Sequence, residues 1–106
     1  MKYQKLYLAG PMSDYPDHNY GAFYYAATDL RSRGYTVATP AEINPDTSIG
    51  WRASMKRDIP HVLDADALAL LPDWQLSRGA RLEVHIAQEL GIPTLPVKVL
   101  VRKALV

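Results

Sequence analysis

The clearest indication of the fold is the apolar stretch Ala67-Leu68-Ala69-Leu70-Leu71, which is followed by Pro72-Asp73-Trp74. An uninterrupted apolar run of this length is typical of a strand whose two faces are both covered by helices. Pro72 ends the strand, because proline has no N–H to donate to a neighbouring strand. Strands buried in this way occur in parallel sheets, so the run predicts an α/β protein with a central parallel sheet.

Three shorter segments have the composition of further strands. Residues 6–9 are apolar and end at Gly10-Pro11, residues 35–38 end ahead of Pro40, and residues 92–95 begin a fourth strand. Glycine and proline at these positions are typical of the turns that end strands. The tail, residues 96–106, is compatible with either an edge strand or a short helix.

Segments with helical spacing separate these strands. Apolar residues recur at intervals of three and four in three segments, residues 20–33, 51–63 and 77–90. This spacing predicts amphipathic helices. Asn19 is a candidate N-cap of the first helix, and Pro60 predicts either a kink in the second or the start of another helix. We expect residues 40–49 to form a loop across the mouth of a site.

The order of the elements, β-α-β-α-β-α-β, predicts a single domain over residues 1–106. Its sheet is expected to be doubly wound and parallel, with four to five strands and helices on both faces. This is a three-layer sandwich of the flavodoxin or Rossmann type. Ligands of such sheets bind beyond the carboxyl ends of the strands. We therefore expect the site in the loops at residues 10–18, 40–49 and 72–78.

Composition and charge argue against several classes of protein. Twelve basic and eleven acidic residues leave a net charge of +1, so we expect no partnership with a nucleic acid polymer. Cysteine is absent and the three histidines are far apart, so we expect no metal and no cofactor. No apolar run approaches the roughly 20 residues of a membrane span. The N-terminal apolar stretch is too short for a signal peptide, so the expected location is the cytoplasm.

Two carboxylates fall on apolar helix stripes. Glu83 follows Ala80 by three residues and Asp58 follows Met55 by three, which turns both side chains toward the sheet. A carboxylate in such a position needs a partner or a function, because burying an unpaired charge is costly. Two plainer interpretations stay open: Glu83 as a partly exposed glutamate near its helix start, and Asp58 as a helix cap ahead of Pro60.

A candidate anion site lies at the start of the third predicted helix, residues 77–90. Ser77-Arg78-Gly79 directly follows a strand, and the free N–H groups of a helix start attract anions. Ser77 is equally suited to cap the helix. Tyr7 and Trp74 lie at strand ends, where each either packs in the core or contacts a ring of a ligand.

Two carboxylates beside an anion site fit the cleavage of a glycosidic bond to a phosphorylated sugar. One carboxylate attacks or stabilises the oxocarbenium-like carbon while another polar group handles protons. Motifs for other chemistry are missing: there is no Walker A motif, and Gly10-Pro11-Met12-Ser13 does not match the GxGxxG pattern.

Several motifs taken together resemble the small DUF4406 family. They are Tyr7-Leu8-Ala9-Gly10-Pro11-Met12-Ser13, Pro16, Asn19, Ala22-Phe23, Pro40-Ala41-Glu42, Leu71-Pro72, Trp74, Ser77, Gly79-Ala80 and Glu83. The resemblance extends over residues 6–95. DUF4406 belongs with the nucleoside 2-deoxyribosyltransferase-like superfamily, which includes nucleoside deoxyribosyltransferases and 2′-deoxynucleoside 5′-phosphate N-hydrolases.

The resemblance implies roles for individual residues. It implies that Glu83 is a nucleophile, that Asp58 and Tyr7 are further catalytic residues, and that Ser77 holds a 5′-phosphate. Together with the anion site, the candidate substrate-binding residues are Gly10, Pro11, Met12, Ser13, Asn19, Trp74, Ser77, Arg78 and Gly79.

We therefore expect an N-glycosidase or deoxyribosyltransferase that acts on a nucleoside or a nucleoside 5′-monophosphate. Two alternatives from other classes stay open. One is a catalytically silent module that binds or senses nucleotides, and the other is an accessory protein that acts by protein contact. The superfamily resemblance further implies a homodimer or higher homo-oligomer, because relatives complete their sites across a subunit interface.

Overall fold

A computed structural model describes residues 3–12 and 15–104 of the chain. Ser13, one of the candidate binding residues, lies outside these ranges. The helices and strands are β1 (Lys5–Ala9), α1 (Tyr20–Ser32), β2 (Thr36–Ala38), α2 (Pro40–Ile43), α3 (Trp51–Asp64), β3 (Ala67–Leu70), α4 (Arg78–Glu89), β4 (Thr94–Pro96) and α5 (Val97–Ala104). Short 3₁₀ turns cover Pro16–Asn19, Thr47–Ile49 and Trp74–Leu76.

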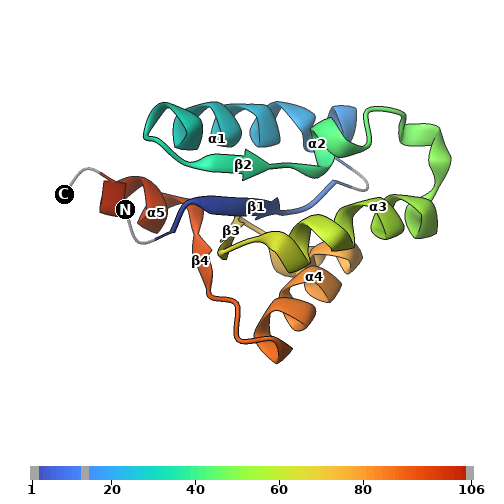
Figure 1. The fold of residues 1–106 in the computed structure, drawn as a ribbon. Helices are drawn as coiled ribbons and strands as arrows, with labels where there is room; N and C mark the ends of the chain where they lie inside the picture. Colours follow the sequence, from blue (N-terminus) through green and yellow to red (C-terminus); the bar gives the residue numbers. More distant parts are fainter. Residues whose placement is uncertain (1–2, 13–14, 105–106) are drawn as a thin grey trace.

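The described strands form one parallel sheet in the order β2-β1-β3-β4 (Figure 1). Tyr7 on β1 pairs with Ala38 on one side and with Leu68 on the other, so β1 is an interior strand. The chain leaves β1 in one direction to form β2 and returns on the other side to form β3. This reversal is the position at which doubly wound sheets bind ligands. The predicted α/β fold is confirmed, with the lower of the two predicted strand numbers.

Alternate residues of β1 face opposite layers of the sandwich. Leu6 and Leu8 belong to a core cluster that contains residues of α1 and α5, whereas Tyr7 and Ala9 belong to a second cluster with residues of α3 and α4. Figure 1 shows α1 on one side of the sheet and α3 with α4 on the other. A strand covered on both faces needs apolar residues at every position, which explains the lack of alternation in the sequence.

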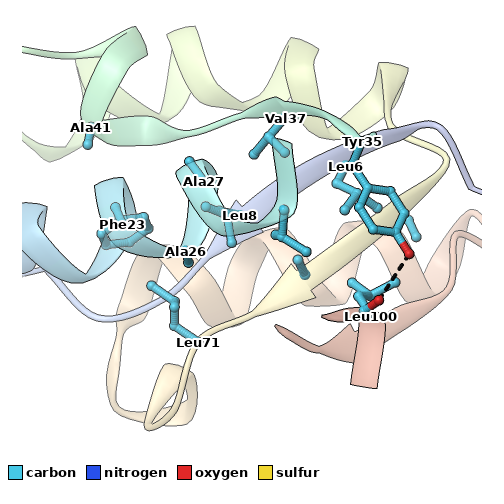
Figure 2. Packing of buried hydrophobic residues seen from close by; sticks show 13 residues of the cluster. Leu6, Leu8, Phe23, Ala26, Ala27, Tyr35, Val37, Ala41, Leu71 and Leu100 are labelled. Atoms are coloured by element: carbon cyan, nitrogen blue, oxygen red, sulfur yellow. Dashed lines mark hydrogen bonds between the residues drawn. The ribbon is translucent and has the colours of Figure 1, made fainter. Parts of the chain in front are cut away.

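The C-terminal tail forms helix α5, which resolves the open choice between strand and helix. Leu100 of this helix is fully buried in the first core cluster. Tyr35 donates a hydrogen bond of 3.1 Å from its hydroxyl group to the carbonyl oxygen of Leu100 (Figure 2). The bond gives the buried tyrosine hydroxyl a partner and attaches α5 to the start of β2.

The segment at residues 40–49 is more ordered than the loop that the sequence predicts. It contains α2 and a 3₁₀ turn at Thr47–Ile49. Thr39 caps α2, because its side chain accepts a hydrogen bond of 3.3 Å from the N–H of Ala41. Pro40 occupies the first helical position, where its fixed φ is compatible with a helix and its missing N–H costs nothing. The Thr-Pro pair is thus a helix start. The prediction of a loop is wrong for residues 40–43 and 47–49, whereas residues 44–46 are irregular.

Helix α3 continues through Pro60 without a second helix beginning there. Pro60 lacks an N–H to donate to the carbonyl group of Lys56, four residues earlier. Both residues lie on the exposed face of the helix, where water can satisfy the carbonyl oxygen. The strand boundaries also differ slightly from the prediction, since β2 begins at Thr36 and β4 extends to Pro96.

Among the helices of residues 3–12 and 15–104, none is long and apolar enough to cross a membrane.

Gly10 provides a test of the packing beyond β1. A Cβ atom at this position would lie 2.8 Å from both Cβ and Cδ1 of Leu71. We expect Gly10→Ala to lower the free energy of unfolding by about 1–3 kcal/mol, because the backbone must shift to relieve the overlap. Gly21→Ala on α1 is the control, since no atom lies within 4 Å of its added Cβ, and it should stabilise the helix by up to about 1 kcal/mol. Urea unfolding measures both, and equal effects would contradict this packing.

Candidate functional site

A cavity of about 200 Å³ lies beyond the carboxyl ends of the strands. All three loop regions predicted from the sequence contribute to it, together with the first turns of α3 and α4. Its lining includes Gly10, Met12, His18, Tyr20, Pro40, Asn44, Asp46, Thr47, Gly50, Trp51, Ser54, Met55, Asp58, Ser77, Arg78, Gly79, Ala80 and Glu83. The position agrees with the rule that parallel sheets bind ligands where the strand order reverses.

Glu83 lines this cavity and is 4% exposed. Tyr7 donates a hydrogen bond of 2.6 Å from its hydroxyl group to Oε2 of Glu83. The two residues come from an interior strand and from the sheet-facing side of α4, where Ala80, Val84 and Ala87 are also buried. The plainer interpretation of Glu83 as a partly exposed glutamate is therefore wrong. A buried carboxyl group with one strong donor and direct access to a cavity is suited to chemistry.

Burial raises the pKa of Glu83 to about 8. The hydrogen bond from Tyr7 acts in the opposite direction, because it stabilises the ionised carboxylate, and the nearby charge of Asp58 raises the pKa further. For Tyr7, burial is also the largest influence, followed by the negative charges of Glu83 and Asp58, and the pKa lies well above its ordinary value of 10.0. Tyr7 therefore remains a hydrogen-bond donor at all ordinary pH values.

Asp58 lines the same cavity from helix α3 and is 4% exposed. It is the eighth residue of its helix, so it does not cap the helix start, and its side chain accepts a hydrogen bond of 2.8 Å from Nδ2 of Asn44. Burial raises the pKa of Asp58 to about 6, whereas the hydrogen bond from Asn44 lowers it. The plainer interpretation of Asp58 as a helix cap is wrong.

The first loop contributes to the cavity through Gly10, Met12 and His18, whereas Pro11 and Asn19 are not among the described lining residues. Asn19 has a left-handed backbone and makes no capping bond. It donates from Nδ2 to the carbonyl oxygen of Pro11 at a distance of 2.9 Å. Asn19 thus holds the loop in shape instead of capping α1.

The start of α4 lies at the cavity, as the sequence predicts. Ser77 caps the helix by accepting a hydrogen bond of 3.1 Å from the N–H of Ala80. The guanidinium group of Arg78 lies 3.7 Å from the ring centroid of Trp51, which is a favourable cation–π distance. Gly79 allows the close approach of α3, because a Cβ atom there would lie 3.2 Å from Sδ of Met55.

Trp74 is placed differently from the expectation. It packs against the second core cluster and is not among the described lining residues of the cavity. The rings that line the cavity are instead those of His18, Tyr20 and Trp51, none of which the sequence analysis named as a binding residue. Asn44 was also missed as a partner of Asp58, because it lies in the segment predicted to be an irregular loop. Helical spacing from Trp51 to Asp58 is the signal that would have placed the tryptophan on the cavity side.

Within the described ranges, no group of three or more His, Cys, Asp or Glu side chains is placed to hold a metal ion. Two buried carboxyl groups, those of Asp58 and Glu83, line the cavity, whereas the ionisable lining residues His18, Asp46 and Arg78 are exposed.

Residues 4–95 match a family described as a domain of unknown function, DUF4406. This chain belongs to the DUF4406 family. The DUF4406 fold also matches a solved 2-deoxyribosyltransferase from the psychrotolerant bacterium Bacillus psychrosaccharolyticus, with a TM-score of 0.66 and 26% sequence identity. The match covers 85% of this chain and 69% of the transferase. No curated protein sequence matches this DUF4406 chain.

The comparisons confirm the predicted relationship. The DUF4406 domain belongs to the nucleoside 2-deoxyribosyltransferase-like superfamily. The transferase is described as a biocatalyst for the synthesis of antiviral and antitumoral nucleosides, and that description applies to the transferase.

The buried carboxyl groups predict an unusual dependence of stability on pH. Burial raises the pKa of Glu83 from 4.5 to about 8 and that of Asp58 from 3.8 to about 6. A carboxyl group whose pKa is raised by folding stabilises the fold fully below its ordinary pKa, and this stabilisation is lost as the pH rises through the folded value. The free energy of unfolding should therefore fall, by on the order of a few kcal/mol, between about pH 5 and pH 9.

Glu83→Gln should remove most of this fall, because glutamine does not ionise and its carbonyl oxygen still accepts from Tyr7. The remaining fall in the free energy of unfolding arises from the ionisation of Asp58. It should be complete near pH 7, about one unit above the Asp58 pKa of about 6. Glu89→Gln, on the exposed side of the same helix, should follow the wild type. Urea titrations at several pH values measure the effect, and identical curves for wild type and Glu83→Gln would contradict the burial of a titrating carboxyl group.

Proposed function

We propose that the protein cleaves the N-glycosidic bond of a nucleoside or nucleoside 5′-monophosphate, with Glu83 as the nucleophile. The observation that carries the proposal is the buried Glu83 carboxyl group, which accepts the hydrogen bond of Tyr7 and lines the cavity together with Asp58. The likeness to a 2-deoxyribosyltransferase supports a reaction at a nucleoside. The acceptor decides the class of reaction: water makes the enzyme a hydrolase, and a second base makes it a transferase.

In the proposed first step, an oxygen of the Glu83 carboxylate forms a bond to C1′ of the sugar. The bond between C1′ and the base nitrogen breaks, and its electron pair leaves with the base. Asp58 gives its proton to the departing base, so the base leaves as a neutral molecule. Tyr7 orients Glu83 by its hydrogen bond and keeps one carboxylate oxygen fixed.

In the second step, water or an acceptor base attacks C1′ and the bond to Glu83 breaks. Asp58 takes up the proton that the attacking group loses. Both residues thereby return to their starting states, and the two displacements together retain the configuration at C1′. The sum of the two steps with water is the hydrolysis of the glycosidic bond to free base and free sugar, or to free base and sugar 5′-phosphate when the substrate is a monophosphate.

The higher pKa of Glu83 places the proton shared with Asp58 mainly on Glu83, so the form that reacts is the less populated of the two. With pKa values of about 6 for Asp58 and about 8 for Glu83, the two groups together hold one proton over much of the range between these values. Because the groups interact, this proton belongs to the pair and can lie on either carboxyl group. The reactive form has the proton on Asp58 and the negative charge on Glu83, where the hydrogen bond from Tyr7 stabilises it.

The start of α4 is the proposed position of a 5′-phosphate. Ser77, Arg78 and Gly79 line the cavity together with Glu83, which lies further along the same helix. Free N–H groups and the helix dipole favour negative charge at this end. The Arg78 guanidinium group, stacked on Trp51, adds a positive charge. With its phosphate at the helix start, a nucleotide would have its sugar carbon further along the helix and therefore nearer to Glu83 than the phosphate is.

The proposal includes a homo-oligomer, as the family resemblance implies. Several large apolar side chains are exposed, among them Leu63, Leu76 and Leu90, and contact with a second copy could cover them. Met55 is buried and Trp74 is half-buried, so neither adds much to such a surface.

Replacing Glu83 tests the nucleophile. We expect Glu83→Gln to lower the rate of base release by at least about 10³-fold, because glutamine cannot form the covalent intermediate. Ligand binding, measured by thermal shift, should persist because the cavity keeps its shape. Release of free base from a panel of nucleosides and nucleoside monophosphates measures the rate, and Glu89→Gln is the matched control on the same helix. Normal turnover by Glu83→Gln would contradict the assignment, and a wild type that binds but never releases base would indicate a silent binding module.

Replacing Arg78 tests the phosphate position. Arg78→Ala should weaken the use of a nucleoside monophosphate by about tenfold or more, because a charge-assisted hydrogen bond contributes roughly 1.5–3 kcal/mol. The matching nucleoside should be affected much less. Arg52→Ala, at an exposed arginine of α3, controls for the loss of one positive charge. Equal losses on both substrates, or equal wild-type activity on both, would contradict a phosphate site.

A further inference from the structure

Asn44 connects three elements beside the cavity. It ends α2, and its N–H donates to the carbonyl oxygen of Pro40 at 2.9 Å. Its own carbonyl oxygen accepts a hydrogen bond from the hydroxyl group of Tyr20 at the start of α1. Its side chain reaches α3, where it contacts Ser54 and Asp58. Asn44 is 4% exposed, so its amide group works almost out of contact with water.

The surroundings determine which way the Asn44 amide points. Nδ2 lies 3.3 Å from the carbonyl oxygen of Ser54 and 2.8 Å from Oδ1 of Asp58. A backbone carbonyl group can only accept a hydrogen bond, so the NH₂ group must face Ser54 whatever the charge on Asp58. Both N–H donors of the amide are therefore in use, one on the backbone of α3 and one on the carboxyl group of Asp58.

This arrangement leaves the carbonyl oxygen of the Asn44 side chain without a hydrogen-bond donor. Oδ1 of Asn44 is buried and has no hydrogen-bond partner among the described residues. Leaving a buried acceptor unpaired is destabilising, and an apolar side chain of similar size would avoid it. Both N–H donors of the Asn44 amide are therefore paired, whereas its carbonyl oxygen is not. This asymmetry points to a need for a neutral donor beside Asp58.

We propose that Asn44 is a positioning residue for Asp58, holding one carboxyl oxygen so that the other is presented to the cavity. This inference rests on the proposed function, in which Asp58 exchanges a proton with the base. Among the described residues, Asn44 is the only hydrogen-bond partner of the Asp58 side chain, and Oδ2 of Asp58 accepts no hydrogen bond. Because α3 is tied to Asn44 at Ser54 as well, the carboxyl group and its donor keep a fixed relation.

The donor also makes Asp58 a stronger acid. Burial raises the pKa of Asp58, and the bond from Asn44 lowers it by stabilising the ionised form. The ionisable groups that interact with Asp58 are Glu83 from α4, Tyr7 from β1 and Tyr20 from α1. None of these is a cation, so the neutral amide of Asn44 is the group that favours the ionised form of Asp58. Loss of the amide should therefore raise the pKa of Asp58.

The titration of Asp58 tests the inference directly. Carbon NMR of protein labelled at the aspartate carboxyl carbons follows each group with pH, and the signal that disappears in Asp58→Asn identifies Asp58. In Asn44→Ala, the midpoint of this signal should move up by about one pH unit or more, because a charge-assisted bond to the carboxylate is lost. An unchanged midpoint would overturn the inference.

Two further variants separate positioning from a general effect on the fold. Thr39→Ala removes the cap of the same helix α2 but leaves the Asn44 amide in place, so the Asp58 midpoint should stay near that of the wild type. Asn44→Asp keeps the shape and replaces the donor by a second carboxyl group. The two adjacent carboxyl groups should then share a proton, so that one of them titrates well above the wild-type midpoint of Asp58. If Thr39→Ala raises the midpoint as much as Asn44→Ala, or if Asp58 titrates normally in Asn44→Asp, the inference is wrong.

The titration needs no substrate, so it decides the role of Asn44 separately from the proposed function. Where the wild type releases base, the pH limb of kcat/KM that belongs to Asp58 should move to higher pH in Asn44→Ala, in parallel with the NMR midpoint. A lower rate with an unmoved limb would indicate a merely structural role and would count against the inference.

Discussion

The hydrogen bond that Tyr7 donates to Glu83 at 2.6 Å is the interaction on which the rest of the site depends. It requires β1 to be an interior strand, so that a tyrosine hydroxyl group reaches the carboxyl ends of the sheet from within the core. It also requires α4 to turn a carboxyl group toward the sheet among small apolar residues. This one contact therefore depends on the parallel topology, on the register of α4 and on the burial of both residues. The cavity lies beside it, with Glu83 in its lining.

A protein that buries two carboxyl groups in one cavity loses stability at neutral and basic pH. The raised pKa values of Glu83 and Asp58 express this loss, because each group binds its proton more tightly in the folded state. Core positions of this kind are normally filled by apolar side chains. Groups with strongly perturbed pKa values that face a cavity are typical of functional sites, where stability is given up for chemistry.

Much of the fold and part of the site could be predicted from the sequence. The strand at residues 67–71 is apolar throughout because both of its faces are buried. The helix around Glu83 has apolar residues at helical spacing because one of its faces is buried. The sequence pattern alone predicts both. Pro60 left a kink and a second helix as alternatives, and the structure rules out the second helix. The sequence alone could not decide, because it does not state whether the carbonyl group that loses its donor is exposed to water. Asn44 and the stacking of Arg78 on Trp51 depend on contacts between distant segments, and no local pattern encodes such contacts.

The central claim is that Glu83 forms a covalent bond to the sugar, and direct trapping of this bond is its most decisive test. A nucleoside with fluorine in place of hydrogen at C2′ destabilises the oxocarbenium-like transition states, so an intermediate should accumulate long enough for mass spectrometry of the intact protein. We predict a mass increase equal to the fluorinated sugar, located on the peptide that contains Glu83 and absent from Glu83→Gln. Base release by the wild type without any adduct on Glu83, or an adduct on another residue, would contradict the account.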